Sequence, residues 1–200
     1  MGKWYVWVTA LVVIVAVAVG VVAYYSFMRG GEGTGTTSTV SAEFPKDVTV
    51  CIYGAHGCPH CDRFRAWLRS VGANFKFCDV QVNATCLQIA KSLVNELGVP
   101  PAIPMSVVEV RLSKPVDGHD VFVFMLIGEF ENSKAWFMLR PKLSGGATLI
   151  PSYVSSNSVK YVKYDWSYVP MYESSGESVK LTKKLSISPA KMLYEFSCHA

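Results

Sequence analysis

Two cysteines that enclose a proline and a histidine, Cys58-Pro59-His60-Cys61, constrain this chain more than any other feature. A short β-branched and aromatic run, residues 48–53, precedes them, and residues 62–71 follow with the apolar spacing of an amphipathic helix. This order places Cys58 at a helix N-terminus, where free backbone N–H groups and the helix dipole stabilise a thiolate. Cys61 then lies on the same helical face, close enough to attack a disulfide on Cys58.

The same motif has a rival interpretation, a structural zinc site. Zinc needs a second pair of ligands, and the sequence has no second Cys-x-x-Cys motif. His56 and His60, one on each side of a short loop, give poor tetrahedral geometry. A c-type haem needs a histidine directly after the second cysteine, where Asp62 stands. We therefore expect thiol–disulfide exchange with no metal and no cofactor, and the expected catalytic residues are Cys58, Cys61, His60 and Pro59.

His60 is expected to tune this chemistry. A protonated imidazole between the cysteines favours the Cys58 thiolate. A more stable thiolate favours the dithiol, so the disulfide becomes more oxidising. Pro59 fits the first helical turn, where no backbone N–H is needed. The alternative for His60 is an exposed loop residue with no role.

The start of the chain predicts a membrane anchor. No charged residue occurs between Trp4 and Phe27, and residues 6–23 are almost wholly Val, Ala, Leu and Ile. This length spans a hydrocarbon core of about 30 Å, and aromatic residues flank both of its ends. We expect residues 1–29 to be a single-pass anchor in the lipid bilayer and residues 30–45 to be a flexible linker. A cleaved signal peptide is the alternative.

Residues 46–142 have the pattern of one domain. The expected order is strand, helix, strand, helix, two strands and a helix, over residues 48–53, 62–71, 74–82, 85–97, 105–112, 120–127 and 133–140. Thr85 and Gln88 form a capping box that opens the second helix. Asp117-Gly118 predicts the turn between the last two strands.

These features together resemble the thioredoxin superfamily. The stretch Ile52-Tyr53-Gly54-Ala55-His56-Gly57 before the motif is similar to a glutaredoxin loop, and Pro59-His60 is similar to the dipeptide of DsbA-type oxidants. Ile103-Pro104 is similar to the cis-proline segment that faces the dithiol in this superfamily. The resemblance covers residues 46–142. It implies an α/β, thioredoxin-like fold with a central mixed sheet flanked by helices, and it implies substrate-binding roles for Ile103, Pro104 and Tyr53.

Residues 143–200 lie beyond the resemblance and are expected to form a β-rich extension. Apolar and polar residues alternate over 162–168 and over 179–187, which predicts a β-hairpin. Ser188-Pro189 then begins a short helix. The extension either closes the domain or forms a surface that binds a partner.

The other cysteines leave alternatives open. Cys78 and Cys86 flank a short loop, so they form a structural disulfide, or Cys86 is a reactive thiol at a helix N-terminus. Cys51 lies in an expected buried strand and is interpreted as an inert core residue. Six cysteines suit an oxidising compartment or the interior of a hyperthermophile.

The sequence thus predicts a membrane-anchored thiol:disulfide oxidoreductase whose domain lies outside the cytoplasm. Cysteine-containing client proteins and a membrane redox partner are the expected partners. Pro59-His60 favours oxidation or isomerisation. The alternatives are a reductase, for example one that serves haem or metal insertion, and a non-catalytic binding or metal-carrying module. A mild net charge of +4, with no basic stripe interleaved with aromatics, argues against nucleic acid as a partner.

Overall fold

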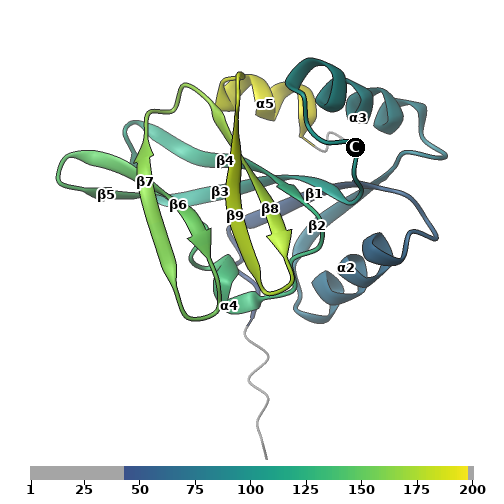
Figure 1. The fold of residues 1–200 in the computed structure, drawn as a ribbon, viewed down its shortest axis with the longest axis horizontal. Helices are drawn as coiled ribbons and strands as arrows, with labels where there is room; N and C mark the ends of the chain where they lie inside the picture. Colours follow the sequence, from purple (N-terminus) through teal and green to yellow (C-terminus); the bar gives the residue numbers. More distant parts are fainter. Residues whose placement is uncertain (1–42, 198–200) are drawn as a thin grey trace, which may run out of the picture. The chain divides into compact units, whose positions relative to one another are not determined.

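The computed structural model describes residues 43–197, which form one nine-stranded sheet and four helices (Figure 1). The predicted anchor, residues 1–29, and the linker up to residue 42 lie outside the described residues. Between residues 43 and 197, no helix is long and apolar enough to cross a membrane.

The elements follow one another along the chain as strands and helices of unequal length. The strands are β1 (Val48–Gly54), β2 (Asn74–Asp79), β3 (Met105–Val116), β4 (His119–Ile127), β5 (Lys142–Ser144), β6 (Ala147–Val154), β7 (Val159–Tyr164), β8 (Val169–Ser175) and β9 (Ser178–Leu185). The helices are α2 (Pro59–Ser70), α3 (Ala84–Leu97), α4 (Ser133–Trp136) and α5 (Pro189–Phe196).

The predicted fold class, a thioredoxin-like α/β fold, is wrong. The described chain is mostly β, with 43% of residues in strands against 25% in helices. The difference arises after residue 142, where the sequence predicted a single hairpin and the structure has five strands. These strands continue the same sheet, because β8 pairs in parallel with β4 through Met125 and Met171.

The strand order in the sheet is β2-β1-β3-β4-β8-β9-β6-β5, and β7 pairs with β6. β1 and β2 are parallel and are connected through α2, whereas β1, β3 and β4 pair antiparallel in turn. Asp117 and Gly118 connect β3 to β4 with φ values of 50° and 80°, which the tight turns of hairpins require. The turn predicted at Asp117-Gly118 is therefore confirmed.

The strands of residues 143–200 were predicted poorly, because apolar and polar residues keep alternating where the backbone bends. Tyr164, Trp166 and Tyr168 are all buried, which mimics one strand over 162–168. Trp166 has a φ of 59°, outside the range of a β-strand, so β7 ends before it and β8 begins after Tyr168. The side chains share a core although the backbone has turned.

Two hydrophobic cores cover the two faces of the sheet. One contains Phe64 and Leu68 of α2 together with Trp136 of α4. The other contains Leu93 of α3 and Met192 of α5. Figure 1 shows α3 and α5 on one side of the sheet and α2 and α4 on the other. Residues of β1 alternate between the two cores, so neighbouring side chains of this strand face different helices.

Two helix boundaries differ from those predicted. The N-cap of α3 is Asn83 rather than Thr85, and the Asn83 side chain accepts a hydrogen bond of 3.1 Å from the Cys86 N–H. An asparagine at this position caps as well as a threonine does, so the capping box was placed two residues late. The helix that was expected to reach about residue 140 ends at Trp136.

Candidate active site

Cys58 caps the N-terminus of α2, as predicted. Its backbone is extended, with φ −77° and ψ 113°, and Pro59 occupies the first helical turn. The Cys61 N–H points at the Cys58 sulfur across 3.4 Å, and the Asp62 N–H donates to the Cys58 carbonyl across 3.0 Å. The sulfur of Cys58 therefore lies where the free N–H groups of the helix favour negative charge.

The two sulfurs of the motif differ sharply in their surroundings. Both cysteines are free, and their Sγ atoms lie 2.7 Å apart. Cys58 is partly exposed, whereas Cys61 is fully buried. Burial, together with the Cys58 contact, raises the pKa of the Cys61 thiol to about 12. Cys58 is thus the accessible sulfur, and Cys61 is kept protonated behind it.

Gly54 provides the space for the buried sulfur. A Cβ atom at this position would lie 3.0 Å from Cys61 Sγ and 3.0 Å from the Phe77 ring. The end of β1 therefore favours glycine, because a Cβ atom there fits only if Cys61 or Phe77 shifts slightly.

A charged cluster lies beside the motif and connects it to the segment after β4. His60 Nδ1 lies 2.8 Å from Glu129 Oε1. Arg63 donates to both carboxylate oxygens of Glu129, across 2.6 Å from Nη2 and 3.2 Å from Nε. His60 Nδ1 and Arg63 Nη2 are themselves 2.9 Å apart. His60 is therefore held against a carboxylate and a guanidinium and is not a loop residue without contacts.

Contacts within the cluster shift the pKa values of Glu129 and Arg63. Burial opposes ionisation of Glu129, but hydrogen bonds from Arg63 and His60 outweigh it and hold the pKa of this carboxyl below its usual range. The hydrogen bond to Glu129 raises the pKa of Arg63, and the nearby Cys58 adds to this shift. Burial and the charge of Glu129 raise the pKa of Glu131.

The sequence offered little to identify these partners. Arg63 lies one helical turn after His60, a spacing that brings two side chains together. Glu129 is 69 positions away along the chain, and no local pattern links it to the motif.

A second charged group lies before the motif. His56 Nε2 is 3.4 Å from Asp79 Oδ2, and Asp79 is only 7% exposed. Arg65 Nη1 is 3.0 Å from His56 Nδ1, and its guanidinium lies 4.0 Å from the centre of the Phe77 ring. This group fixes the loop between β1 and α2.

The predicted proline segment lies at the same end of the sheet. The peptide bond between Ile103 and Pro104 is cis. Pro104 is followed by Met105, which pairs with Tyr53 near the end of β1. The Gly128 N–H donates to the Pro104 carbonyl across 2.8 Å, so this segment is joined to the one that carries Glu129. Ile103, predicted to bind substrate, is 38% exposed.

Tyr53 does not line this site. Its side chain is fully buried in the core with α3 and α5, on the face opposite α2. The hydroxyl donates to the Phe196 carbonyl across 2.6 Å, and burial raises the pKa of Tyr53. A substrate bound at the dithiol would not contact this side chain. Its contacts indicate that it secures α5.

The remaining cysteines within the described residues are not free. Cys78 and Cys86 form a disulfide between β2 and α3, which settles the alternatives that the spacing left open. Cys51 is buried in the core as expected, but it is disulfide-bonded, so its interpretation as an inert residue without a disulfide partner is wrong. Only Cys58 and Cys61 remain as free thiols in the part of the chain that the structure describes.

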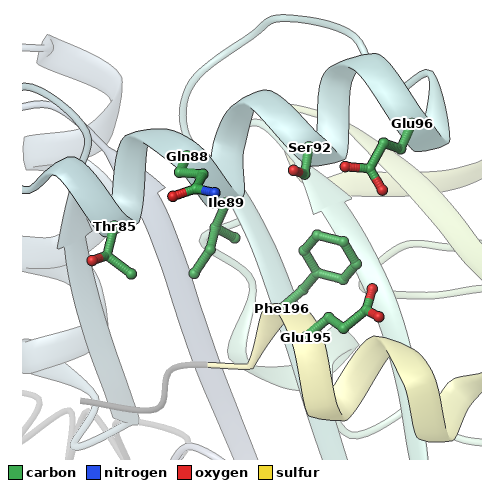
Figure 2. Close-up of a pocket in the computed structure, with 7 residues that line it drawn as sticks. All are labelled: Thr85, Gln88, Ile89, Ser92, Glu96, Glu195 and Phe196. Carbon is green, nitrogen blue, oxygen red and sulfur yellow. The ribbon is translucent and has the colours of Figure 1, made fainter.

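Two pockets lie away from the dithiol, and no free thiol in the described part of the chain lines them. A pocket of about 250 Å³ lies between α3 and α5, and Figure 2 shows the Ile89 and Phe196 side chains pointing into it, with Glu96 and Glu195 at its margin. A second, of about 540 Å³, lies beside the disulfide of Cys78 and Cys86. Within residues 43–197, no three His, Cys, Asp or Glu side chains gather as metal ligands.

No family model, curated protein or solved structure matches this chain. Function is therefore argued from the geometry of the dithiol. That geometry consists of an exposed and a buried sulfur at a helix N-terminus, with a charged cluster beside them.

Proposed function

We propose that this chain is a membrane-anchored thiol:disulfide oxidoreductase, with chemistry of the kind found in the thioredoxin superfamily. The observation that carries this proposal is the pair of free sulfurs 2.7 Å apart, one exposed and one buried. Thiol–disulfide exchange needs an accessible sulfur that forms the mixed disulfide and a second sulfur that can reach it. Cys58 and Cys61 meet both requirements.

In the oxidising direction, a client thiolate attacks Cys58 of the Cys58–Cys61 disulfide. A bond forms between the client sulfur and Cys58 Sγ, and Cys61 leaves and takes up a proton. A second client thiolate then attacks the client sulfur of the mixed disulfide and releases Cys58. The client gains a disulfide, the two cysteines of this chain gain two electrons, and the two protons that the client thiols lost pass to solvent or to the released cysteines.

The raised pKa of Cys61 slows the return reaction of the mixed disulfide. A thiol whose pKa is about 12 stays protonated once it has left, so it does not re-attack the mixed disulfide readily at neutral pH. For turnover, a membrane redox partner that carries a disulfide must take the two electrons from the dithiol. The disulfide of Cys78 and Cys86 agrees with an oxidising compartment outside the cytoplasm.

A Cys61→Ser variant tests the proposal directly. Without Cys61, the Cys58 thiolate forms a mixed disulfide by attacking a client disulfide, and only a thiol of the client or of another molecule can then release it. We expect the full-length variant in its own membranes to accumulate mixed disulfides that disappear on reduction. A Cys58→Ser variant, which keeps the buried thiol alone, is the matched control. Absence of any trapped client in the Cys61→Ser variant would contradict disulfide exchange.

A reductase that uses the same dithiol is the second candidate, and Glu129 favours it. Glu129 pairs with Arg63, and a carboxylate that offsets the Arg63 charge disfavours the Cys58 thiolate, which makes the disulfide harder to reduce. The reduction potential separates the two directions. A value near that of thioredoxin, roughly −270 mV, would assign the reductase, and a value well above it would assign the oxidant.

The location of the domain has its own test. We propose that it faces the outside of the cell membrane. A bulky thiol reagent that does not cross membranes should then label Cys58 in intact cells. Labelling only after the cells are opened would place the domain in the cytoplasm.

A further inference from the structure

We propose that Glu129 sets the oxidising strength of the Cys58–Cys61 disulfide by neutralising the positive charge of Arg63 beside it. This inference rests on the proposed function, because it concerns the equilibrium of the same dithiol. Glu129 contacts neither sulfur and is therefore a positioning and charge-setting residue rather than a catalytic one.

The first observation is that one carboxylate engages both basic side chains of the cluster. Arg63 donates to both oxygens of Glu129, and His60 Nδ1 lies 2.8 Å from one of them. Glu129 has only 24% of its side chain exposed, whereas His60 and Arg63 are 62% and 54% exposed. The anion is thus the sheltered member of the cluster, and solvent screens its charge less than that of a fully exposed pair.

The second observation is that the backbone holds Glu129 firmly. On one side, the Gly128 N–H bonds to the Pro104 carbonyl across 2.8 Å. On the other, Phe130 is fully buried, and its carbonyl accepts a hydrogen bond of 3.0 Å from the Trp136 indole. The segment that carries Glu129 is therefore tied to the proline segment and to the core, and its carboxylate lies against Arg63 and His60 of α2.

The sign of the effect follows from the charges that face Cys58. Among the charged groups near the motif, Arg63 interacts with Cys58 as well as with Glu129 and Glu131. Asp62 pairs with Arg65, and His56 lies against Asp79. Removing the negative charge of Glu129 leaves Arg63 unpaired and favours the Cys58 thiolate. A more stable thiolate stabilises the reduced dithiol, so the disulfide becomes the stronger oxidant.

The measurement is the equilibrium constant for reduction of the disulfide by glutathione, determined for the intact protein and its variants. We expect Glu129→Gln to raise this constant by about fivefold and Arg63→Gln to lower it by a similar factor. The double variant removes one charge of each sign, and we expect its constant to lie within about twofold of the wild-type value. Glu131→Gln is the matched control, because it removes the same charge from the same segment without a hydrogen bond to Arg63 or His60.

Three outcomes would overturn the inference. They are an unchanged or lowered constant in Glu129→Gln, an equal rise in Glu131→Gln, and a double variant that keeps the full effect of either single change. If Glu129→Gln unfolds, Arg63→Gln becomes the deciding variant. An equilibrium constant that does not fall in Arg63→Gln would overturn the inference. A wild-type dithiol that does not exchange with glutathione or with any trapped client would instead refute the proposed function, and the inference with it.

Discussion

The two ends of the sheet are built on different principles. The dithiol end is made of residues 54–65 and 128–131, and it carries free thiols, ion pairs and exposed histidines. The strand-rich half, residues 142–185, packs aromatic side chains against one another and against β4. Tyr172, for example, is fully buried, meets the Phe124 ring edge-on at 5.2 Å, and donates to the Pro151 carbonyl across 2.7 Å.

This contrast indicates a division of roles. Reactive groups need water, charge and access, which a well-packed core excludes. Buried aromatic contacts supply stability and need none of these. We therefore expect changes at the dithiol end to alter exchange chemistry with little loss of stability, and changes in the strand-rich half to do the reverse.

Loss of the exposed sulfur should have the largest effect. Cys58→Ser removes the atom that we propose forms the mixed disulfide, so we expect exchange with glutathione to fall to the uncatalysed rate. Thermal unfolding of the reduced protein should change little, because Cys58 is only partly buried. Retention of exchange in this variant would mean that Cys61 reacts directly, against its burial.

The pH dependence of Cys61 should show the second largest effect. Its pKa is raised to about 12, so the thiolate fraction is small at neutral pH and rises tenfold with each pH unit below that value. In the Cys58→Ser variant, where burial still acts, the rate of Cys61 alkylation by iodoacetamide should rise about a thousandfold from pH 7 to pH 10. A rate that levels off near pH 9 would show an ordinary thiol.

In the strand-rich half, a substitution should lower the stability and leave the exchange rate unchanged. We expect Tyr172→Ala to lower the free energy of unfolding by about 3–5 kcal/mol, because it removes a buried ring and leaves a cavity. The exchange rate, measured below the unfolding temperature, should stay at the wild-type value. Tyr194→Ala, at a side chain that is 81% exposed, is the control and should change the stability by less than about 0.5 kcal/mol. Loss of exchange in folded Tyr172→Ala would break the division of roles.

The sequence predicted the dithiol end better than the strand-rich half, and the reason is the range over which each signal acts. The helix that begins after Cys58 follows from local features, namely a proline in the first turn and apolar residues at helical spacing. Five strands cannot be recognised in this way when Tyr164, Trp166 and Tyr168 alternate through a corner. An alternating pattern reports burial and does not report that the backbone stays straight.

The side chains that contact the motif from distant parts of the chain could not be predicted from local sequence patterns either. Glu129 reaches His60 only because β3 and β4 return the chain to the end of β1, and no spacing encodes this contact. Tyr53 is different, because the sequence alone could have placed its side chain. Strict alternation along β1 places Tyr53 and Cys51 on one face and Ile52 on the other, so Tyr53 could have been assigned to the core opposite α2.

The disulfide of Cys78 and Cys86 is a cysteine pair like that of the dithiol end, but its role is structural, like that of the packing in the strand-rich half. Replacing both residues by alanine should lower the free energy of unfolding by about 2–3 kcal/mol, because the unfolded chain loses a short closed loop. The glutathione equilibrium of Cys58 and Cys61 should not change. A shifted equilibrium would show that the two cysteine pairs exchange with each other.

The smallest effect comes from one hydroxyl group removed in each region. Tyr53→Phe, below the dithiol end, leaves the Phe196 carbonyl buried without its donor, and Tyr164→Phe does the same to the Tyr168 carbonyl in the strand-rich half. Each change should lower the free energy of unfolding by about 1–2 kcal/mol, measured in urea. Neither should alter the rate of exchange with glutathione.

This matched pair sharpens the comparison because the chemical change is identical. Tyr53 lies in the strand that leads to Cys58, yet its side chain faces α5. If Tyr53→Phe slows exchange while Tyr164→Phe does not, the end of β1 transmits changes from the α5 face to the sulfurs. Equal costs with unchanged exchange would show that the two faces of β1 act independently, with Gly54 and Cys61 isolated from the packing on the opposite side.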